Sequence, residues 1–208
     1  AAPSAVAPLT AIAERAELEG ISISAGNSSA DIAAQVEAAD VVVIIGSTST
    51  LEGVDRASLS LDDGADALIA TVAQRRPTIV LLEAPGAVLT PWRNSVAAIA
   101  CLFLGGEETG RAWAAMLFGD VTPAGKLPIA LPADENETLA PQSPEVLYSE
   151  GVSTSYRSPG TKAAFAFGHG LSYTRFSFTQ PTQWTDGCLA TSCVRVVVTN
   201  TGGRPGTE

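Results

Sequence analysis

The chain has 208 residues, of which 46% are hydrophobic and 16% charged, and its formal net charge is −10. This composition is typical of a globular chain with a sizeable buried core and excludes a disordered one. The acidic balance excludes nucleic acid and anionic membrane surfaces as expected partners, because both bind through clustered Lys and Arg. A neutral ligand such as a sugar is compatible with it.

No segment of the sequence predicts a membrane span. The longest unbroken apolar run, Val96 to Leu104, is too short, because a spanning helix needs about 20 residues. The chain begins with Ala1 and shows no charged-then-apolar leader, so we expect a processed chain or a piece of a longer one.

Cysteines and glycosylation sequons favour a secreted protein. Cys188 and Cys193 flank a turn-like stretch and can close a small hairpin disulfide, whereas Cys101 lies in an apolar run and predicts a buried thiol. The sequons are Asn27-Ser28-Ser29 and Asn136-Glu137-Thr138. Together these features favour a secreted or extracellular location.

The first part of the chain alternates helix-like and strand-like segments. Leu9 to Leu18 predicts a helix, and Ile21 to Ala25 a short strand. Ser29-Ala30-Asp31 can cap a helix that runs to Ala39. Val41 to Gly46 is apolar throughout, which predicts a parallel strand buried on both faces.

The same alternation continues after a long loop, Ser47 to Leu61. Asp62 or Asp63 can cap a helix that runs to Arg76 and is stopped by Pro77. Further strands are predicted over 78–82, 98–104 and 127–131, and a helix over 107–118. Strands that alternate with helices predict an α/β fold, with a mostly parallel sheet and helices on both faces.

The pattern changes in the last third of the chain. From Pro132 to Gly170, Pro, Ser and Gly are spread through the sequence, which predicts a long excursion or a linker. Phe176 to Phe178 and Val194 to Thr199 are typical of the first strands of a β-sandwich, but are too few to bury its core. We therefore expect an α/β domain over 1–175 and a truncated β-sandwich segment over 176–208.

The loop after the strand at 41–46 carries the main chemical candidates. In parallel sheets, ligands bind at the loops that follow the carboxyl ends of strands. This loop contains Glu52, Asp55 and Arg56, and a carboxylic acid beside apolar residues can act as a general acid. In the alternative interpretation, which residue types alone favour, Asp55 and Arg56 form a loop-ordering ion pair and Glu52 is solvated.

Other motifs have structural interpretations. Gly105 to Gly110 opens a helix, but its two glutamates would repel a phosphate and it lacks the lysine of a P-loop. His169 is the single histidine and is expected to be a turn residue, and Trp92 and Trp113 are expected in the core. One histidine without a C-x-x-C motif predicts no zinc site.

A series of short motifs runs in order along roughly residues 30 to 178. They are Glu52-Gly53-Val54-Asp55-Arg56, Pro85-Gly86-Ala87-Val88, Gly105-Gly106-Glu107-Glu108, Leu117-Phe118-Gly119-Asp120-Val121, Gly125-Lys126-Leu127-Pro128, Tyr148-Ser149-Glu150-Gly151, Tyr156-Arg157 and, most specific, Phe167-Gly168-His169-Gly170-Leu171-Ser172-Tyr173-Thr174. This ordered set resembles the carboxyl-terminal half of family 3 glycoside hydrolases, the β-glucosidase and β-xylosidase family. The tail to Glu208 is similar to the start of the fibronectin-type-III-like domain that follows in many members.

The resemblance implies an α/β sandwich domain that packs on an upstream (β/α)8 barrel in a retaining hydrolase of β-linked sugars. A barrel aspartate is then the nucleophile, and Glu52, the glutamate of the Glu-Gly-x-Asp-Arg run, is the acid/base. Asp55 and Arg56 would shape its loop or contact substrate. No metal or organic cofactor is implied. Because these residues would supply only one of the two carboxylates, we expect the chain by itself to hydrolyse nothing.

Three functions stay open. The first is a fragment of a retaining β-glycosidase, in which a β-glucosidase is favoured over enzymes for xylosides or N-acetylglucosaminides. The second is a non-catalytic carbohydrate-binding or scaffolding domain of the same fold. The third is an unrelated flavodoxin-like ligand domain, and the lack of a phosphate-binding loop counts against it.

Overall fold

The computed structural model describes residues 5–26, 29–138, 145, 147–158, 160 and 162–208. The chain divides into two units. The α/β unit comprises residues up to 114 together with 127–169, and the β unit comprises 115–126 together with 170–208. The sequon residues Asn27 and Ser28 lie outside the described residues.

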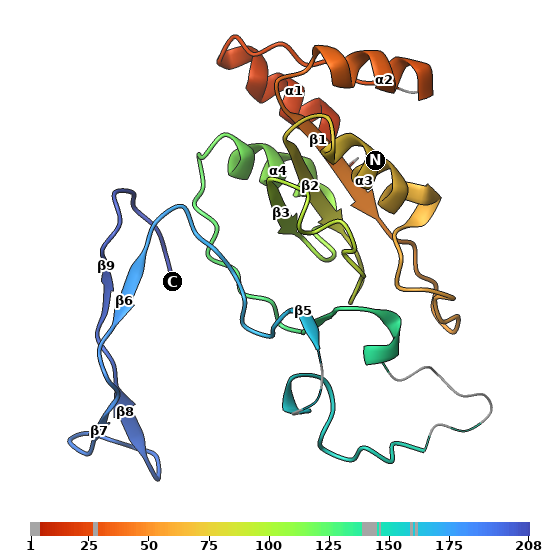
Figure 1. The fold of residues 1–208 in the computed structure, drawn as a ribbon. Helices are drawn as coiled ribbons and strands as arrows, with labels where there is room; N and C mark the ends of the chain where they lie inside the picture. The colour runs from red at the N-terminus through yellow and green to blue at the C-terminus, as the bar shows by residue number, and fades with distance from the viewer. Residues whose placement is uncertain (1–4, 27–28, 139–144, 146, 159, 161) are drawn as a thin grey trace. The chain divides into compact units, whose positions relative to one another are not determined.

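The α/β unit is built on a three-stranded parallel sheet (Figure 1). Its strands are β1 (Val42–Ser47), β2 (Thr78–Glu83) and β3 (Ala98–Cys101), with β2 in the centre. Val42 pairs with Thr78, and Ile79 pairs with Ala98. The predicted parallel sheet is confirmed, although its third strand ends at Cys101 rather than at Leu104.

The core forms on both faces of β2, because successive side chains of a strand point in opposite directions. Val80 and Leu82 pack in one cluster with Ile69 of α3 (Ala65–Ala73). Glu83 points to the opposite face of β2 from Val80 and Leu82. Its Oε1 accepts a 2.7 Å hydrogen bond from Nε1 of Trp113 in α4 (Thr109–Leu117). The predicted helices on both faces are therefore confirmed.

The outer strand and the segment before it differ from the prediction. Val43 and Ile45, which point to the same face of β1, are each 38% exposed, so the expectation that this strand is buried on both faces is wrong. Ile21 to Ala25 forms no strand, so that prediction is wrong. Ile21 and Ile23 are exposed, and the Ala25 carbonyl accepts from the Gln35 side chain instead of from a neighbouring strand.

Two helices precede the sheet as predicted, and the third begins differently. The first two are α1 (Pro8–Leu18) and α2 (Ser29–Ala38). Neither Asp62 nor Asp63 caps α3, which follows a 3-10 turn at Asp62–Gly64 and has Gly64 at its N-cap with φ +71°. Asp66 in the first turn of α3 instead accepts from Leu61 N and Trp92 Nε1.

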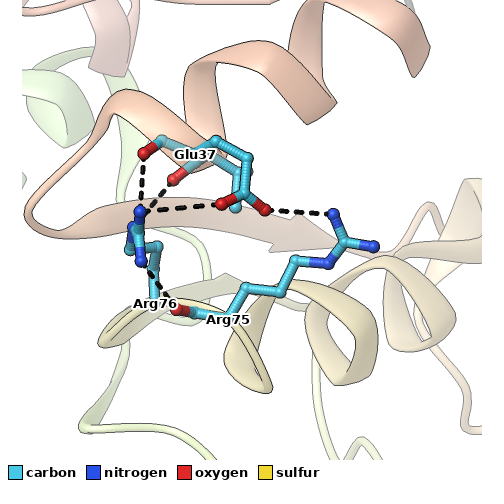
Figure 2. A network of polar contacts seen from close by, with 4 residues as sticks. Glu37, Arg75 and Arg76 are labelled. Carbon is cyan, nitrogen blue, oxygen red and sulfur yellow. Dashed lines mark hydrogen bonds and ion pairs between the residues drawn. The ribbon is translucent and has the colours of Figure 1, made fainter.

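Two arginines after α3 hold α2 in place (Figure 2). The sequence predicted them inside the helix, but α3 ends at Ala73 and both lie in the following turn. Arg75 pairs with Glu37 at 3.2 Å, and Arg76 Nε donates to the Val36 carbonyl at 3.1 Å. Arg76 also donates to the Glu37 carbonyl at 2.6 Å. Its bonds thus satisfy carbonyls at the end of α2, where a helix leaves its last C=O groups unpaired.

Short antiparallel pairs complete both units. In the α/β unit, β4 (Leu131–Pro132) pairs with β5 (Ala163–Phe165), so the strand predicted over 127–131 is reduced to its last residue. In the β unit, β6 (Phe176–Phe178) pairs with β9 (Val198–Asn200), and β7 (Thr182–Trp184) pairs with β8 (Cys193–Arg195). The strand predicted over 194–199 is thus divided between β8 and β9. Cys188 and Cys193, which the sequence left as a pair able to bond, are joined by a disulfide.

Among the described residues, no helix combines the length and apolar character that a bilayer crossing requires. Cys101 is a free, partly buried thiol. Burial raises the pKa of this thiol to about 11.

The core cluster provides a stability prediction. Ile69 is 0% exposed, and its neighbour Leu68 is 37% exposed on the same helix. We expect Ile69→Ala to lower the free energy of unfolding by about 2–5 kcal/mol, through lost burial and a residual cavity. Leu68→Ala should cost about 1 kcal/mol or less. Urea denaturation followed by tryptophan fluorescence measures both, and equal losses would contradict this assignment of the core.

Candidate functional site

The β1–α3 loop, Thr48 to Leu61, starts at the carboxyl edge of the parallel sheet. Thr48 N donates to the Glu83 carbonyl at 3.3 Å, so the loop leaves the sheet beside the end of β2. Its other end is fixed by Leu61, which is buried in the core and donates its N–H to Asp66. This is the edge at which parallel sheets bind ligands.

Glu52 lies at the tip of this loop, in a β-turn. Val54 N donates to the Leu51 carbonyl at 3.3 Å, and Gly53 has φ +76° at the third position of the turn. A positive φ there is typical of a type II turn and favours glycine. The turn leaves Glu52 exposed, and none of the hydrogen bonds or ion pairs described for the chain involves its carboxylate.

Arg56 orders the loop, but not through Asp55. Its guanidinium donates to Thr48 Oγ1 at 3.3 Å and to the backbone carbonyl of Ala87. Among the described ion pairs there is none between Asp55 and Arg56, so the expected pair is not formed. Asp55 is exposed. Arg56 therefore connects the start of the loop to the segment after β2.

Asp62 closes the loop at its base. Its Oδ2 accepts from Ser49 N at 2.6 Å and from Ser49 Oγ at 2.8 Å. The backbone hydrogen bond from Ser49 is the largest cause that lowers the pKa of Asp62, followed by the Ser49 hydroxyl and the nearby charge of Arg56. Asp62 is therefore an ionised acceptor at neutral pH. The sequence indicated this residue only as a helix cap.

Glu135 reaches the same loop from a distant part of the chain. It lies in a 3-10 turn, Glu135–Glu137, and its Oε1 accepts from Ser58 Oγ and, at 2.9 Å, from Leu59 N. These bonds, the Ser58 hydroxyl first, lower the pKa of Glu135. Sequence reasoning missed this residue, because its partners lie more than 70 residues earlier and no local pattern connects them.

The loop encloses a hollow of about 350 Å³. Its lining includes six polar side chains of the loop, together with Asp62 at the base of the loop: Ser49, Thr50, Asp55, Arg56, Ser58, Ser60 and Asp62. Leu51 and Val54, which flank the turn of Glu52, line it too. The hollow thus offers hydroxyl, carboxylate and guanidinium groups, a set that can hydrogen-bond a hydroxylated ligand, and Glu52 itself is not one of its lining residues.

The other candidates occupy structural positions. The Gly105 to Gly110 stretch forms a 3-10 turn and the start of α4, where Glu108 pairs with Arg111 at 2.7 Å. His169 N donates to the Ala166 carbonyl in a turn. Trp92 and Trp113 are 3% exposed, so their prediction as core residues is confirmed. Within the described ranges, no group of three or more His, Cys, Asp or Glu side chains is placed to hold a metal ion.

The site geometry can be compared with known proteins. The family model for the glycosyl hydrolase family 3 C-terminal domain matches residues 1–173. Probable beta-glucosidase J of Neosartorya fischeri is 35% identical over 191 residues, which cover 85% of this chain and 22% of that protein.

Solved structures of beta-glucosidases are also similar to this chain. DesR, a beta-glucosidase from Streptomyces venezuelae in complex with D-glucose, is 36% identical with a TM-score of 0.76, over 85% of this chain and 24% of that one. Beta-glucosidase D2-BGL from Chaetomella raphigera is 27% identical with a TM-score of 0.85, over 96% and 33%. The chain thus spans between 22% and 33% of the length of these relatives.

The two loop carboxylates provide a titration prediction. We expect Ser49→Ala to raise the pKa of Asp62 part of the way to its usual 3.8, because the backbone bond from Ser49 remains. Ser58→Ala should raise the pKa of Glu135 toward 4.5. Carboxyl NMR titrations measure both values. Each variant is the control for the other. If one variant shifted the pKa values of both carboxyl groups, Asp62 and Glu135 would not bind the loop independently.

The same lowered pKa values set a pH dependence of stability. A carboxylate whose pKa is lowered on folding stabilises the folded state above its unfolded pKa, and this contribution is lost as the pH falls through the folded value. For Asp62 and Glu135 the contribution is therefore complete at neutral pH. It declines as the pH falls from the usual pKa, 4.5 for Glu135 and 3.8 for Asp62, through the lower pKa of the folded state.

Proposed function

The chain belongs to glycosyl hydrolase family 3, as its C-terminal domain, and we propose that it is part of a retaining β-glucosidase in which Glu52 is the acid/base. The observation that carries the proposal is the position of Glu52. It lies at the tip of a loop anchored at the carboxyl edge of the parallel sheet, in a turn whose flanking residues Leu51 and Val54 line a hollow. The β-glucosidases to which the chain is similar support the substrate class, a terminal β-linked glucoside.

In this mechanism Glu52 acts twice. It first protonates the glycosidic oxygen as the bond to the leaving group breaks, and then removes a proton from the water that attacks the glycosyl-enzyme intermediate. The nucleophile would be an aspartate of a (β/α)8 barrel domain outside these residues. A retaining mechanism needs the two carboxyl groups about 5 Å apart. The exposed position of Glu52 suits a carboxylate that meets a substrate held by another domain.

Arg56 and Asp55 would support Glu52 in different ways. The bonds of Arg56 to Thr48 and to the Ala87 carbonyl fix the leg of the loop that follows the Glu52 turn. Asp55 lines the hollow and would be available to a sugar hydroxyl. In this proposal Arg56 shapes the loop, and Asp55 contacts the substrate.

The proposal includes the organisation and location of the chain. Residues 1–175 would be the α/β sandwich domain, and residues 176–208 the beginning of a fibronectin-type-III-like domain. The antiparallel pairs that start with β6 at Phe176 support this division. A secreted glycoprotein is supported by the Cys188–Cys193 disulfide and by the exposed Asn136 in its sequon.

A non-catalytic carbohydrate-binding or scaffolding domain is the second candidate. It is favoured by the lack of any described partner for the Glu52 carboxylate, since a catalytic acid commonly has neighbours that tune it. The size of the native protein separates the two candidates. An immunoblot band several hundred residues longer than 208 would support an attached barrel, and a band near 208 residues would favour the binding domain.

We expect Glu52→Ala in the native-length enzyme to slow hydrolysis of cellobiose, a poor leaving-group substrate, by roughly 100- to 10,000-fold. A 2,4-dinitrophenyl β-glucoside needs little protonation of its leaving group, so its glycosylation step should be slowed far less. Azide should restore turnover of the activated substrate and yield a β-glucosyl azide, because a small anion can enter the space of the deleted carboxylate. Steady-state kinetics and product analysis measure these effects.

The control for this variant is Glu17→Ala. Glu17 is an exposed glutamate of α1, far along the chain from the β1–α3 loop, and its replacement should leave both substrates unaffected. Equal losses on both substrates in Glu52→Ala, without azide rescue, would assign Glu52 to structure rather than to proton transfer.

We also expect the 208-residue chain by itself to be inactive, because it would supply only one of the two carboxylates of a retaining mechanism. The measurement is release of p-nitrophenol from p-nitrophenyl β-glucoside by the purified chain. The chain carrying Glu52→Ala is the control for contaminating glucosidase. Turnover that the wild-type chain shows and this variant lacks would contradict the need for a second domain.

A further inference from the structure

One of the carboxylates that hold the β1–α3 loop comes from a distant part of the chain. Glu135 Oε1 accepts from Ser58 Oγ and from Leu59 N, and the Leu59 carbonyl accepts from Leu89 N at 2.9 Å. Both backbone polar groups of Leu59 are thus bound by residues outside the loop. Hydrogen bonds to an ionised acceptor are stronger than neutral ones, so the bond that Glu135 accepts from Leu59 N is stronger than the bond from Leu89 N to the Leu59 carbonyl.

The remaining anchors lie on either side of the Glu52 turn. Asp62 binds Ser49 before the turn, and Arg56 binds Thr48 and the Ala87 carbonyl after it. Between these anchors, the one hydrogen bond described for the tip is the bond that closes the Leu51–Val54 turn. The position of Glu52 is therefore set by how firmly the loop is held before the turn, at residues 48–49, and after it, at residues 56–61.

From these contacts we infer that Glu135 is a positioning residue for Glu52, an inference that rests on the proposed function. Glu135 fixes the leg of the loop that returns from the tip and so limits the places that the Glu52 carboxylate can reach. Proton transfer to a leaving oxygen needs hydrogen-bond reach, and a misplacement of 1 Å can cost about 100-fold in rate.

Glu135 does not act as an acid itself. Its oxygen already accepts two hydrogen bonds from the loop, and these lower its pKa. Protonation of that oxygen would weaken both bonds. Glu135 is therefore suited to accept hydrogen bonds constantly, whereas the acid/base role needs a carboxylate that exchanges its proton in every cycle.

The first test compares two glutamates of the same 3-10 turn in the native-length enzyme. Glu135→Ala should lower kcat on cellobiose about 10- to 100-fold, with KM changed less than about threefold, because the variant displaces the acid/base while the substrate is held mainly by another domain. Glu137 is the matched control. It also accepts a backbone N–H, that of Lys162 at 2.9 Å, and none of the described hydrogen bonds joins its side chain to the loop, so Glu137→Ala should keep wild-type kcat.

A second set of variants separates positioning from a general loss of structure. Glu135→Gln keeps an acceptor oxygen and should recover most of the kcat that Glu135→Ala loses. Ser58→Ala removes one donor from the loop side and should give a smaller loss in the same direction. The double variant Glu52→Ala/Glu135→Ala should be no slower than Glu52→Ala alone, because a residue that acts through Glu52 has no effect once Glu52 is absent.

Hydrogen exchange of this chain gives a readout that does not depend on activity. The Leu59 amide should exchange about 10-fold faster or more in Glu135→Ala than in wild type, and at the wild-type rate in Glu137→Ala. Unchanged Leu59 exchange would overturn the inference, since Glu135 would then hold nothing.

The kinetic outcomes distinguish this inference from the proposed function. If Glu52→Ala is slow on cellobiose but Glu135→Ala, Glu135→Gln and Ser58→Ala match wild type, the inference fails and the proposed function stands. A loss in Glu135→Ala that adds fully to the loss in Glu52→Ala would also overturn it. If Glu52→Ala has wild-type kinetics, both fail together.

Discussion

The central strand β2 lies between β1 and β3, and water is excluded from both of its faces. Val80, Leu81 and Leu82 are fully buried, which requires cover on either side of the sheet. Because β1 and β3 run parallel to β2, the chain must cross back to the start of the sheet between one strand and the next. α3 forms the crossover between β1 and β2. All the strands therefore end at the same edge, and the β1–α3 loop lies there.

The β1–α3 loop is ordered by charged side chains rather than by a hydrophobic core. Three carboxylates, those of Asp62, Asp66 and Glu135, accept backbone N–H groups of the loop. The Arg56 guanidinium donates to a carbonyl outside the loop. A surface loop has backbone groups without regular partners, and ionised side chains satisfy them with strong directional bonds. These bonds lie away from the tip of the loop, where Glu52 is exposed.

Membership of glycosyl hydrolase family 3 agrees with this architecture, and the chain spans only part of the length of its relatives. The hollow is lined by residues 49–62 alone, and in the proposed function they would supply one wall of a site. A retaining mechanism needs a second carboxylate, which the proposed function assigns to another domain. The positioning role of Glu135 follows from this division, since an acid/base presented to another domain depends on the stiffness of its own loop.

The sequence by itself determined the parallel strands at 41–46 and 78–82, the helices that flank them and the loop with Glu52, because each has a local signal. It left open whether Cys188 and Cys193 are bonded, and the structure joins them. Tertiary structure decided that Ile21 to Ala25 forms no strand and that Asp62 binds Ser49 instead of capping α3. It also decided the contact of Glu135 with Ser58 and Leu59. Periodicity and capping report on neighbours within one or two turns, whereas these outcomes depend on which distant donors fold within reach of a side chain.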